Sequence, residues 1–283
     1  MPSIADSDAV YDRRRQLAQH QAALTLLQSA LSDPQLHEYH WLDLACGKGQ
    51  IILHIQENLP AEARAKIVYS GFDIDNEYLR YAERTAEACG FKRVQIDVGR
   101  LQDFASALQE DDRFDFITLT NTLHEIRPFI LPPVLFDCVR RLSPTGSLFV
   151  YDMERLPVPE LGAITWTRLE MAQVISALCH EIGALDYVPA VGRWRHTSCF
   201  GWNVQLQRSH FAVDYGALEN FRSSACATMK ATISRLLTAK LGACKKTLDG
   251  LTRFGPETGD EDSDATRQLY DYWSLTRELE EWS

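Results

Sequence analysis

The sequence predicts an α/β protein with a doubly wound, mostly parallel sheet and a helical extension towards its C-terminal end. Two observations carry this prediction. Short apolar, β-branched runs alternate with helical patterns between residues 40 and 152, and such alternation is typical of parallel strands joined by right-handed crossovers. Beyond residue 213 the strand-like runs stop, and only helical patterns continue.

The alternating elements can be placed in chain order. Leucines recur at near-helical spacing within residues 11–31 and predict an amphipathic helix before the first strand. Pro-Thr-Gly at 144–146 predicts a turn before the fifth strand. The apolar β-branched runs predict strands near 40–46, 67–73, 93–98, 115–121 and 147–152. The intervening patterns predict helices near 49–58, 76–89, 102–109 and 131–142.

The later elements are a helix, two β-like stretches and a helical region. The helix is predicted over 167–181 and the β-like stretches near 186–195 and 199–207. Apolar residues at helical spacing from 218 to 241 predict one or two amphipathic helices, and a final helix follows the acidic, turn-rich loop near 255–264. The apolar face of this region either packs on the main domain or binds a partner, such as a second copy of the chain. We therefore divide the chain into an N-terminal helical segment 1–36, an α/β domain 37–210 and a C-terminal helical extension 211–283.

Composition favours a cytoplasmic enzyme. The 283 residues are 45% hydrophobic, and no uninterrupted apolar run approaches the ~18 residues of a membrane span. Seven cysteines are scattered without a Cys-x-x-Cys pair, which favours reduced thiols inside the cell. The net charge is −10, so broad binding to nucleic acids is disfavoured, although a local basic groove is not excluded.

The most informative residues follow the first two strands. Asp43, Gly47 and Gly49 lie in Asp-Leu-Ala-Cys-Gly-Lys-Gly, and Asp73 ends the second strand. A glycine turn that opens a helix, with a carboxylate on the next strand, suits a nucleoside ligand, because helix N–H groups face it and the acid accepts ribose hydroxyls. Ile52 stands where a dinucleotide fingerprint needs its third glycine, and the spacing required for a phosphate-binding loop is absent.

The turn resembles motif I of class I S-adenosylmethionine-dependent methyltransferases. The resemblance covers roughly residues 38–208 and implies a Rossmann-like, seven-stranded sheet whose last two strands form an antiparallel edge hairpin. It also implies S-adenosyl-L-methionine as the cofactor. The residues expected to bind that cofactor are Asp43, Ala45, Gly47 and Gly49 around the methionine part, Asp73 at the ribose, and Ile74, Leu101 and Asn121 elsewhere in the site.

The sequence departs from this family after the third strand. Family members commonly place an acidic residue there, in contact with the adenine amino group, whereas this chain has Arg100. The adenine contact is then expected from the backbone around Leu101 or from Asp103. Arg100 is equally well explained as an ordinary surface arginine.

Residues 115–126 resemble motif IV of the same family, where the fourth strand ends beside the transferable methyl group. The Asn-Pro-Pro-Tyr form of this motif belongs to enzymes that methylate planar amide or amino nitrogens, and Asn-Thr-Leu-His here disfavours that subclass. His124 and Glu125 are the candidate catalytic residues, with His124 as the general base for a hydroxyl, thiol or protonated amine. Structural roles are the alternative for both.

Several other polar and aromatic residues have less specific interpretations. Asp152 either faces the acceptor or caps the end of the fifth strand, and Glu154 is expected to be a solvated cap. A loop with Glu160 and Trp166 is expected to cover the acceptor. The cations and aromatics from Arg193 to Trp202 either stack on a planar substrate or form an ordinary hairpin surface. We expect no metal site, because the histidines at 37 and 40 lack a third ligand.

The predicted reaction is methyl transfer to an unidentified acceptor, with a small molecule or a protein side chain favoured. A sulfonium methyl group is already activated, so catalysis mainly requires that the acceptor atom is positioned and that water is excluded. Two alternatives stay open. One is a binding or scaffold protein that keeps the fold and acts through its C-terminal helices, and the other is an enzyme that uses a nucleotide-type ligand for different chemistry.

Overall fold

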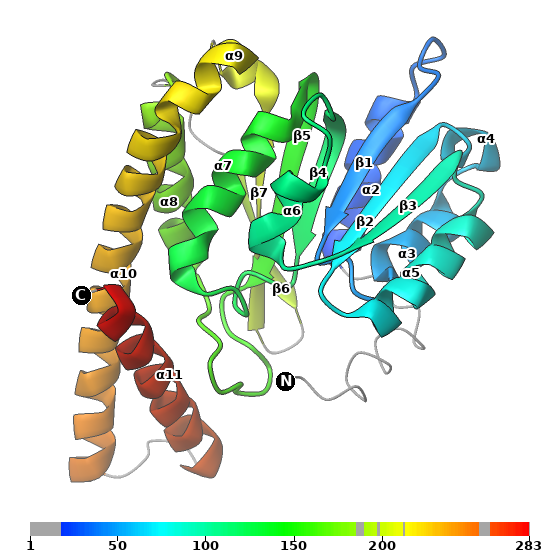
Figure 1. The fold of residues 1–283 in the computed structure, drawn as a ribbon. Helices are drawn as coiled ribbons and strands as arrows, with labels where there is room; N and C mark the ends of the chain where they lie inside the picture. The colour runs from blue at the N-terminus through cyan, green and yellow to red at the C-terminus, as the bar shows by residue number, and fades with distance from the viewer. Residues whose placement is uncertain (1–17, 185–189, 197–198, 212, 255–260, 283) are drawn as a thin grey trace.

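The computed structural model describes residues 18–184, 190–196, 199–211, 213–254 and 261–282. Within them the chain forms a seven-stranded sheet in the order β3-β2-β1-β4-β5-β7-β6, with helices on both faces (Figure 1). The first five strands pair in parallel, whereas β7 is antiparallel to β5 and β6 to β7, so the predicted fold class is confirmed. The strands are β1 (Tyr39–Leu44), β2 (Ile67–Asp73), β3 (Arg93–Val98), β4 (Phe114–Thr120), β5 (Leu142–Met153), β6 (Ala190–His196) and β7 (Cys199–Gln207).

Most of the helices match the predicted positions within one or two residues. The predicted helix over 102–109 is instead a 3₁₀ turn followed by the very short α6. The α-helices are α2 (Ala18–Leu31), α3 (Gln50–Asn58), α4 (Ala61–Arg64), α5 (Asn76–Cys89), α6 (Phe104–Ala107), α7 (Leu131–Arg141), α8 (Arg168–Glu181), α9 (Tyr215–Leu218), α10 (Arg222–Phe254) and α11 (Glu261–Trp282). The 3₁₀ segments are Leu101–Asp103, Pro128–Ile130, Arg208–His210 and Glu219–Phe221. Residues 11–17, 186–189 and 255–260, for which a helix start, a strand start and most of an acidic loop were predicted, lie outside the described part. Residues 261–264, also predicted as part of that loop, instead begin α11.

Local sequence signals explain why the main helices begin and end where they do. Asp75 caps α5, since its carboxylate accepts the backbone N–H groups of Glu77 and Tyr78 at 2.8 and 3.1 Å. Gly90 ends α5 with φ +77°, which glycine adopts without a Cβ clash. Thr167 begins α8 with a reciprocal capping box to Glu170.

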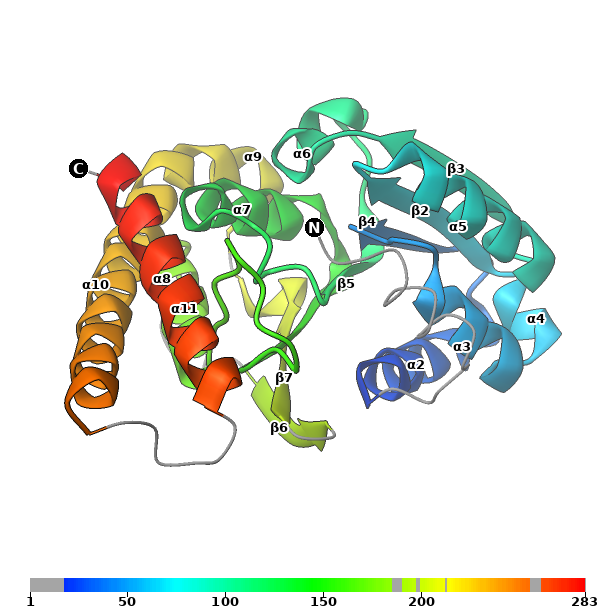
Figure 2. The ribbon, with the colours of Figure 1, turned by 90° about the horizontal axis from the view of Figure 1, so that it is seen from below.

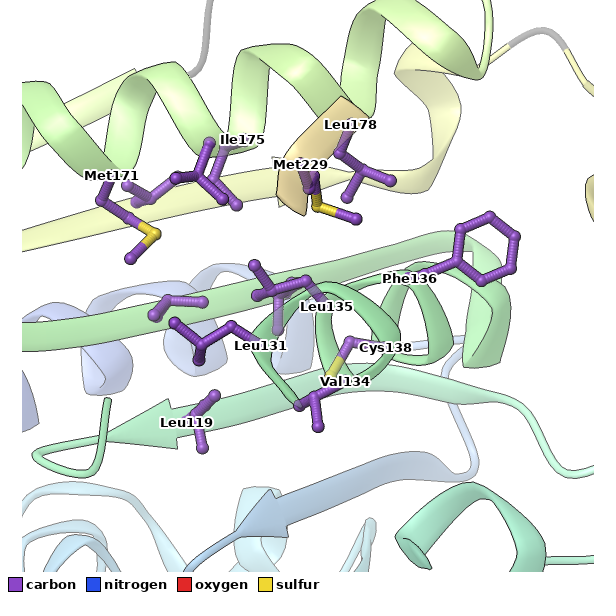
Figure 3. Close-up of a cluster of buried hydrophobic side chains, with 14 of the residues drawn as sticks. Leu119, Leu131, Val134, Leu135, Phe136, Cys138, Met171, Ile175, Leu178 and Met229 are labelled. Carbon is purple, nitrogen blue, oxygen red and sulfur yellow. The ribbon is translucent and has the colours of Figure 1, made fainter. Parts of the chain in front are cut away.

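The two faces of the sheet bury different sets of side chains, because neighbouring residues of a strand point to opposite faces. Trp41 of β1 packs with residues of α2 and α3, such as Leu27 and Ile55. Leu42 and Leu44 of the same strand face the other way, into a cluster shared with α7, α8 and α10. Figure 3 shows the centre of this second cluster, where side chains from β4, α7, α8 and α10 meet.

The fifth strand is longer than predicted. It begins at Leu142, so the predicted turn at 144–146 is wrong, and these residues form an irregularity inside β5. The pairing register shifts here, from Phe114 opposite Leu142 to Phe116 opposite Ser147. A Cβ at Gly146 would lie 2.5 Å from the carbonyl oxygen of Phe114, so only glycine permits this close approach of the two backbones.

The C-terminal helices pack against their own chain. α10 lies along α7 and α8, and its buried Met229, Ile233 and Leu237 belong to the cluster that covers one face of the sheet (Figures 1 and 3). Arg222, at the start of α10, donates two hydrogen bonds to the Asp137 carboxylate of α7, at 2.5 and 2.8 Å. Much of the apolar face that suggested a partner is therefore buried within the chain.

None of the described helices is both long enough and apolar enough to cross a membrane. The six cysteines with described side chains are unpaired, and five of them are buried.

Candidate functional site

The turn between β1 and α3 has a backbone that favours glycine. Ala45, Gly47 and Gly49 have φ values of +52°, +54° and +78°. A Cβ at Gly49 would lie 3.0 Å from the side chain of Ile52 and 3.3 Å from the backbone of Ala82 in α5, so this glycine also permits close packing of α3 on α5. The turn brings the N-terminal end of α3 to the carboxyl edge of the sheet, where unpaired N–H groups attract polar ligands.

The Asp73 carboxylate holds this turn against the end of β2. Its Oδ2 accepts the N–H of Gly47 at 2.9 Å, and its Oδ1 accepts the N–H of Asp75 at the same distance. The N–H of Cys46 also donates to the carbonyl of Phe72, at 3.2 Å. Each carboxylate oxygen of Asp73 can accept a further hydrogen bond, because an ionised carboxylate offers about four acceptor positions. The structure therefore brings Gly47 and Asp73 together as the sequence predicts.

Asp43 is buried beneath the same turn, in a polar network between β1, β2 and β4. Its two oxygens accept the hydroxyl of Thr118 at 2.6 Å and that of Tyr69 at 3.1 Å. Trp41 in turn donates its indole N–H to Thr118 at 2.8 Å. Burial raises the pKa of Asp43 to about 7, against the two hydrogen bonds, which favour the carboxylate. A cation placed near Asp43 would thus favour its ionised form.

Two exposed apolar residues are neighbours of Asp73, one in the chain and one in the sheet. Ile74 follows Asp73 and is 68% exposed, and Val98 pairs with Asp73 at the end of β3 and is 60% exposed. Leu101 is half-buried against the core, and Arg100 precedes it. An aromatic ring placed here would cover apolar surface. The sequence pointed to Ile74 and Leu101 but not to Val98, whose only signal is its position as the last residue of β3.

Asn121 follows β4 in a left-handed conformation, with φ +54°. Its N–H donates to the carbonyl of Tyr151 on β5 at 2.9 Å, which fixes the backbone. Its side-chain oxygen is buried and has no hydrogen-bond partner among the described residues. A buried acceptor without a donor costs free energy, so this oxygen is suited to receive an N–H or O–H group from a ligand.

His124 and Asp152 form a buried pair at the ends of β4 and β5. Asp152 accepts from the backbone N–H of His124 at 2.9 Å, and it lies 2.8 Å from Nδ1 of the imidazole. Burial opposes the charged imidazole, but the charge and hydrogen bond of Asp152, with the charges of Glu125 and Glu160, outweigh it and raise the pKa of His124 to about 9. The Asp152 contact orients the ring and leaves Nε2 to face the remaining acids.

Glu125 and Glu160 complete this acidic group. One oxygen from each and one ring nitrogen of His124 all lie within 4.8 Å of one another. Burial raises the pKa of Glu125, the charge of His124 opposes this, and the charges of Glu160, Asp152 and Asp73 at the end of β2 raise it further. The three atoms are of types that bind divalent cations. At neutral pH, however, the imidazole of His124 is protonated and itself places a positive charge beside the two acids.

Two residues suggested to contact the acceptor, Trp166 and Trp202, have structural roles instead. Trp166 and Trp202 are fully buried, and the indole N–H of Trp202 donates to the carbonyl of Trp166 at 2.7 Å, so neither side chain is available to an acceptor. Glu154 is not a free cap, because Arg193 donates to it from two nitrogens, at 3.2 and 2.8 Å. The side chains of residues 194–196, also suggested for stacking, lie outside the described set.

Comparisons with known proteins identify the family and support the fold. Residues 36–195 match the family model described as a methyltransferase domain. No curated protein matches the sequence. The structure is similar to the CurJ carbon methyltransferase (15% identity, TM-score 0.55), over 72% of this chain and 59% of that one. It is similar to the DszA carbon methyltransferase (16%, 0.50), over 69% and 53%. A further match is the magnesium protoporphyrin IX methyltransferase ChlM from Synechocystis PCC 6803 with bound SAM (13%, 0.45), over 68% and 80%. The chain thus spans little more than half the length of the two carbon methyltransferases.

Proposed function

This chain belongs to the methyltransferase domain family, and we propose that it transfers the methyl group of S-adenosylmethionine to an acceptor atom that loses a proton in the reaction. The observation that carries the proposal is the His124–Asp152 pair, which stands across the sheet edge from the glycine turn and Asp73. A buried, oriented imidazole beside an acidic group is suited to accept a proton at that edge.

The residues around the glycine turn would hold the cofactor. Ala45, Gly47 and Gly49 would surround its methionine part, with Asp43 beneath them. Asp73 would accept the ribose hydroxyls at the acceptor positions that its two hydrogen bonds from backbone N–H groups leave unoccupied. Ile74 and Leu101 would contact the adenine, with Val98 extending the same apolar surface.

Features of this chain fit such a ligand. The unsatisfied Asn121 side-chain oxygen offers an acceptor for a cofactor N–H or O–H group. The turn can be approached closely, since a Cβ at Gly47 would have no neighbour nearer than the Gln50 side chain at 3.4 Å. Asp43, with a pKa raised to about 7, would ionise more fully beside the positive charges of the cofactor.

The acceptor side would supply proton transfer and orientation. When bound, S-adenosylmethionine supplies an activated methyl group on a sulfonium centre. Nε2 of neutral His124 would take the proton that the acceptor atom loses, and Asp152 would stabilise the imidazolium that forms. Glu125 would contact the acceptor and, with its pKa raised, is suited to exchange a hydrogen bond with it.

A small molecule or a protein side chain is the proposed acceptor class. The acids beside His124 and the net charge of −10 oppose the approach of a polyanion such as RNA or DNA. The same acids would favour an acceptor that is neutral or carries a positive charge.

The test is transfer of a tritiated methyl group. The purified chain, tritiated S-adenosylmethionine and cell extract are incubated, and protein, RNA and small-molecule fractions are counted separately. We expect label in the small-molecule or protein fraction, and a roughly 10²–10⁴-fold slower transfer with His124→Gln. Lys246→Gln, on the exposed face of α10, is the matched control. Cofactor binding without label in any fraction would contradict the proposed enzyme.

A further inference from the structure

We infer that α11 is a positioning element of the acceptor side, which acts through Ser274 and Glu278 on the two loops that carry His124, Glu125 and Glu160. This inference rests on the proposed function, since it concerns the same site. Figure 2 shows α11 alongside the loops that follow β4 and β5. Those loops supply the acidic group, whereas α11 lies more than a hundred residues further along the chain.

The loop after β5 is attached to α11 by direct contacts. The N–H of Gly162, two residues after Glu160, donates to the hydroxyl of Ser274 at 3.0 Å. Nearer to β5, Arg155 donates to the carboxylate of Asp264 at 2.8 Å. α11 thus holds the loop on both sides of Glu160, at Arg155 before it and at Gly162 after it.

The loop after β4 is attached to the same helix by an ion pair. Nε of Arg127, two residues after Glu125, donates to the carboxylate of Glu278 at 3.0 Å, and Arg127 also contacts Glu281. Glu278 is 6% exposed, so loss of Arg127 would leave a buried carboxylate without its partner, at a larger cost than breaking a pair on an open surface. This contact sets the path of the chain directly after His124 and Glu125.

The two loops are also attached to each other. The N–H of Ile164 donates to the carbonyl of His124 at 2.8 Å. Three hydrogen bonds, Gly162 to Ser274, Ile164 to His124 and Arg127 to Glu278, together with the short chain segments between them, therefore link Ser274 to Glu278 through both loops. A change at either α11 residue is expected to alter the spacing of the acids around His124.

The buried polar residues of α11 distinguish this role from simple covering of the core. Leu275 packs into the main hydrophobic cluster, and the Sγ of Cys244 on α10 contacts the carbonyl of Gln268, which anchors the helix. A helix that only covered apolar surface would gain by carrying apolar residues on its buried face. Ser274 and Glu278 are instead polar, 1% and 6% exposed, and directed to loop groups near the acids.

The test compares Glu278→Gln and Ser274→Ala with the control Arg277→Gln, an exposed position on α11 whose side chain lies over Trp273. Hydrogen exchange is measured in peptides that cover residues 122–130 and 159–165. The imidazole signal of His124 is followed by NMR through a pH titration. Calorimetry with S-adenosylmethionine reports the cofactor side separately.

We expect roughly tenfold faster exchange in both loops for the two α11 variants, and a shifted His124 titration, with cofactor affinity changed less than about twofold. The control should match the unmodified chain in all three measurements. Once an acceptor is known, kcat should fall more than KM rises. Faster exchange confined to α11 itself, with an unchanged His124 titration, would overturn the inference. Hydrogen exchange, the NMR titration and calorimetry do not need turnover. A chain that shows the expected changes in both loops and at His124 but does not transfer methyl groups would therefore count against the proposed function alone.

Discussion

At the residue scale, Asp73 combines two tasks that the sequence could only partly predict. Its carboxylate fixes the glycine turn through Gly47 and retains capacity for a ligand. We predict that Asp73→Ala weakens S-adenosylmethionine binding by about 1–3 kcal/mol, because charge-assisted hydrogen bonds to the ribose are lost and the turn loosens. Isothermal titration calorimetry measures the change directly.

The control for this prediction is Asp97→Ala, which removes a carboxylate from β3 that accepts a hydrogen bond from the nearby Gln95 side chain. Circular dichroism establishes that both variants are folded. An Asp73→Ala chain that binds the cofactor as tightly as the control would remove Asp73 from the proposed site.

His124 gives a second residue-scale prediction, in the pH dependence of methyl transfer. With a pKa of about 9, the imidazole is protonated at neutral pH and cannot accept a proton. The kcat/KM for the acceptor should therefore rise with pH up to about 9 and then level off, since the neutral form is the base. Asp152→Asn removes the charge that raises this pKa, so the rise should move to lower pH while the maximal rate falls. A profile that is flat between pH 6 and 10 for both proteins would exclude His124 as the base.

At the element scale, the strands and helices could be predicted because each leaves a local period in the sequence. Irregular features leave none. The start of β5 at Leu142 depends on the close approach of Gly146 to Phe114, and the carbonyl of Trp166 meets the indole N–H of Trp202, 36 residues further along the chain. The same reason explains why the glycine turn could be placed but the role of Asp152 could not. Its partner His124 is 28 residues away in the sequence and reaches it only because β4 and β5 are neighbours in the sheet.

The contact between α2 and α3 supports a prediction about acid stability. His20 of α2 and His54 of α3 are buried, with ring centroids 5.9 Å apart. Burial, with a smaller effect of His54, lowers the pKa of His20 to about 3. Below about pH 6.5, His20 is protonated in the unfolded chain but stays neutral in the folded chain. The folded state therefore loses stability as the pH falls from 6.5 towards 3.

His20→Phe removes this titration and keeps a ring in place. Between pH 7 and pH 5 the unmodified chain should lose about 2 kcal/mol more unfolding free energy than the variant, at about 1.4 kcal/mol per pH unit below 6.5. Urea unfolding at both pH values gives the comparison. Equal losses for the two proteins would show that His20 is protonated at little cost in the folded state.

At the scale of the whole molecule, the sheet and the C-terminal helices share one hydrophobic cluster. Leu119 of β4, Leu135 of α7, Met229 of α10 and Leu275 of α11 all belong to it (Figure 3 shows the first three). We therefore propose that the predicted extension 211–283 unfolds together with the α/β domain. Its loop contacts through α11 give this shared core a functional consequence, because the extension then shapes the acceptor side.

Arg222 provides the test of that cooperativity. Its guanidinium joins α10 to the Asp137 carboxylate, which is 4% exposed and would be left with weaker pairing to Arg140 in Arg222→Gln. We predict a loss of about 1–3 kcal/mol in unfolding free energy, because a buried carboxylate loses its bidentate partner. Urea unfolding followed by tryptophan fluorescence and by circular dichroism should give one coincident transition, shifted as a whole. Lys246→Gln should leave the midpoint unchanged. Two separate transitions, with only the helical signal shifted, would mean that the extension is an independent unit and that the shared cluster does not couple it to the sheet.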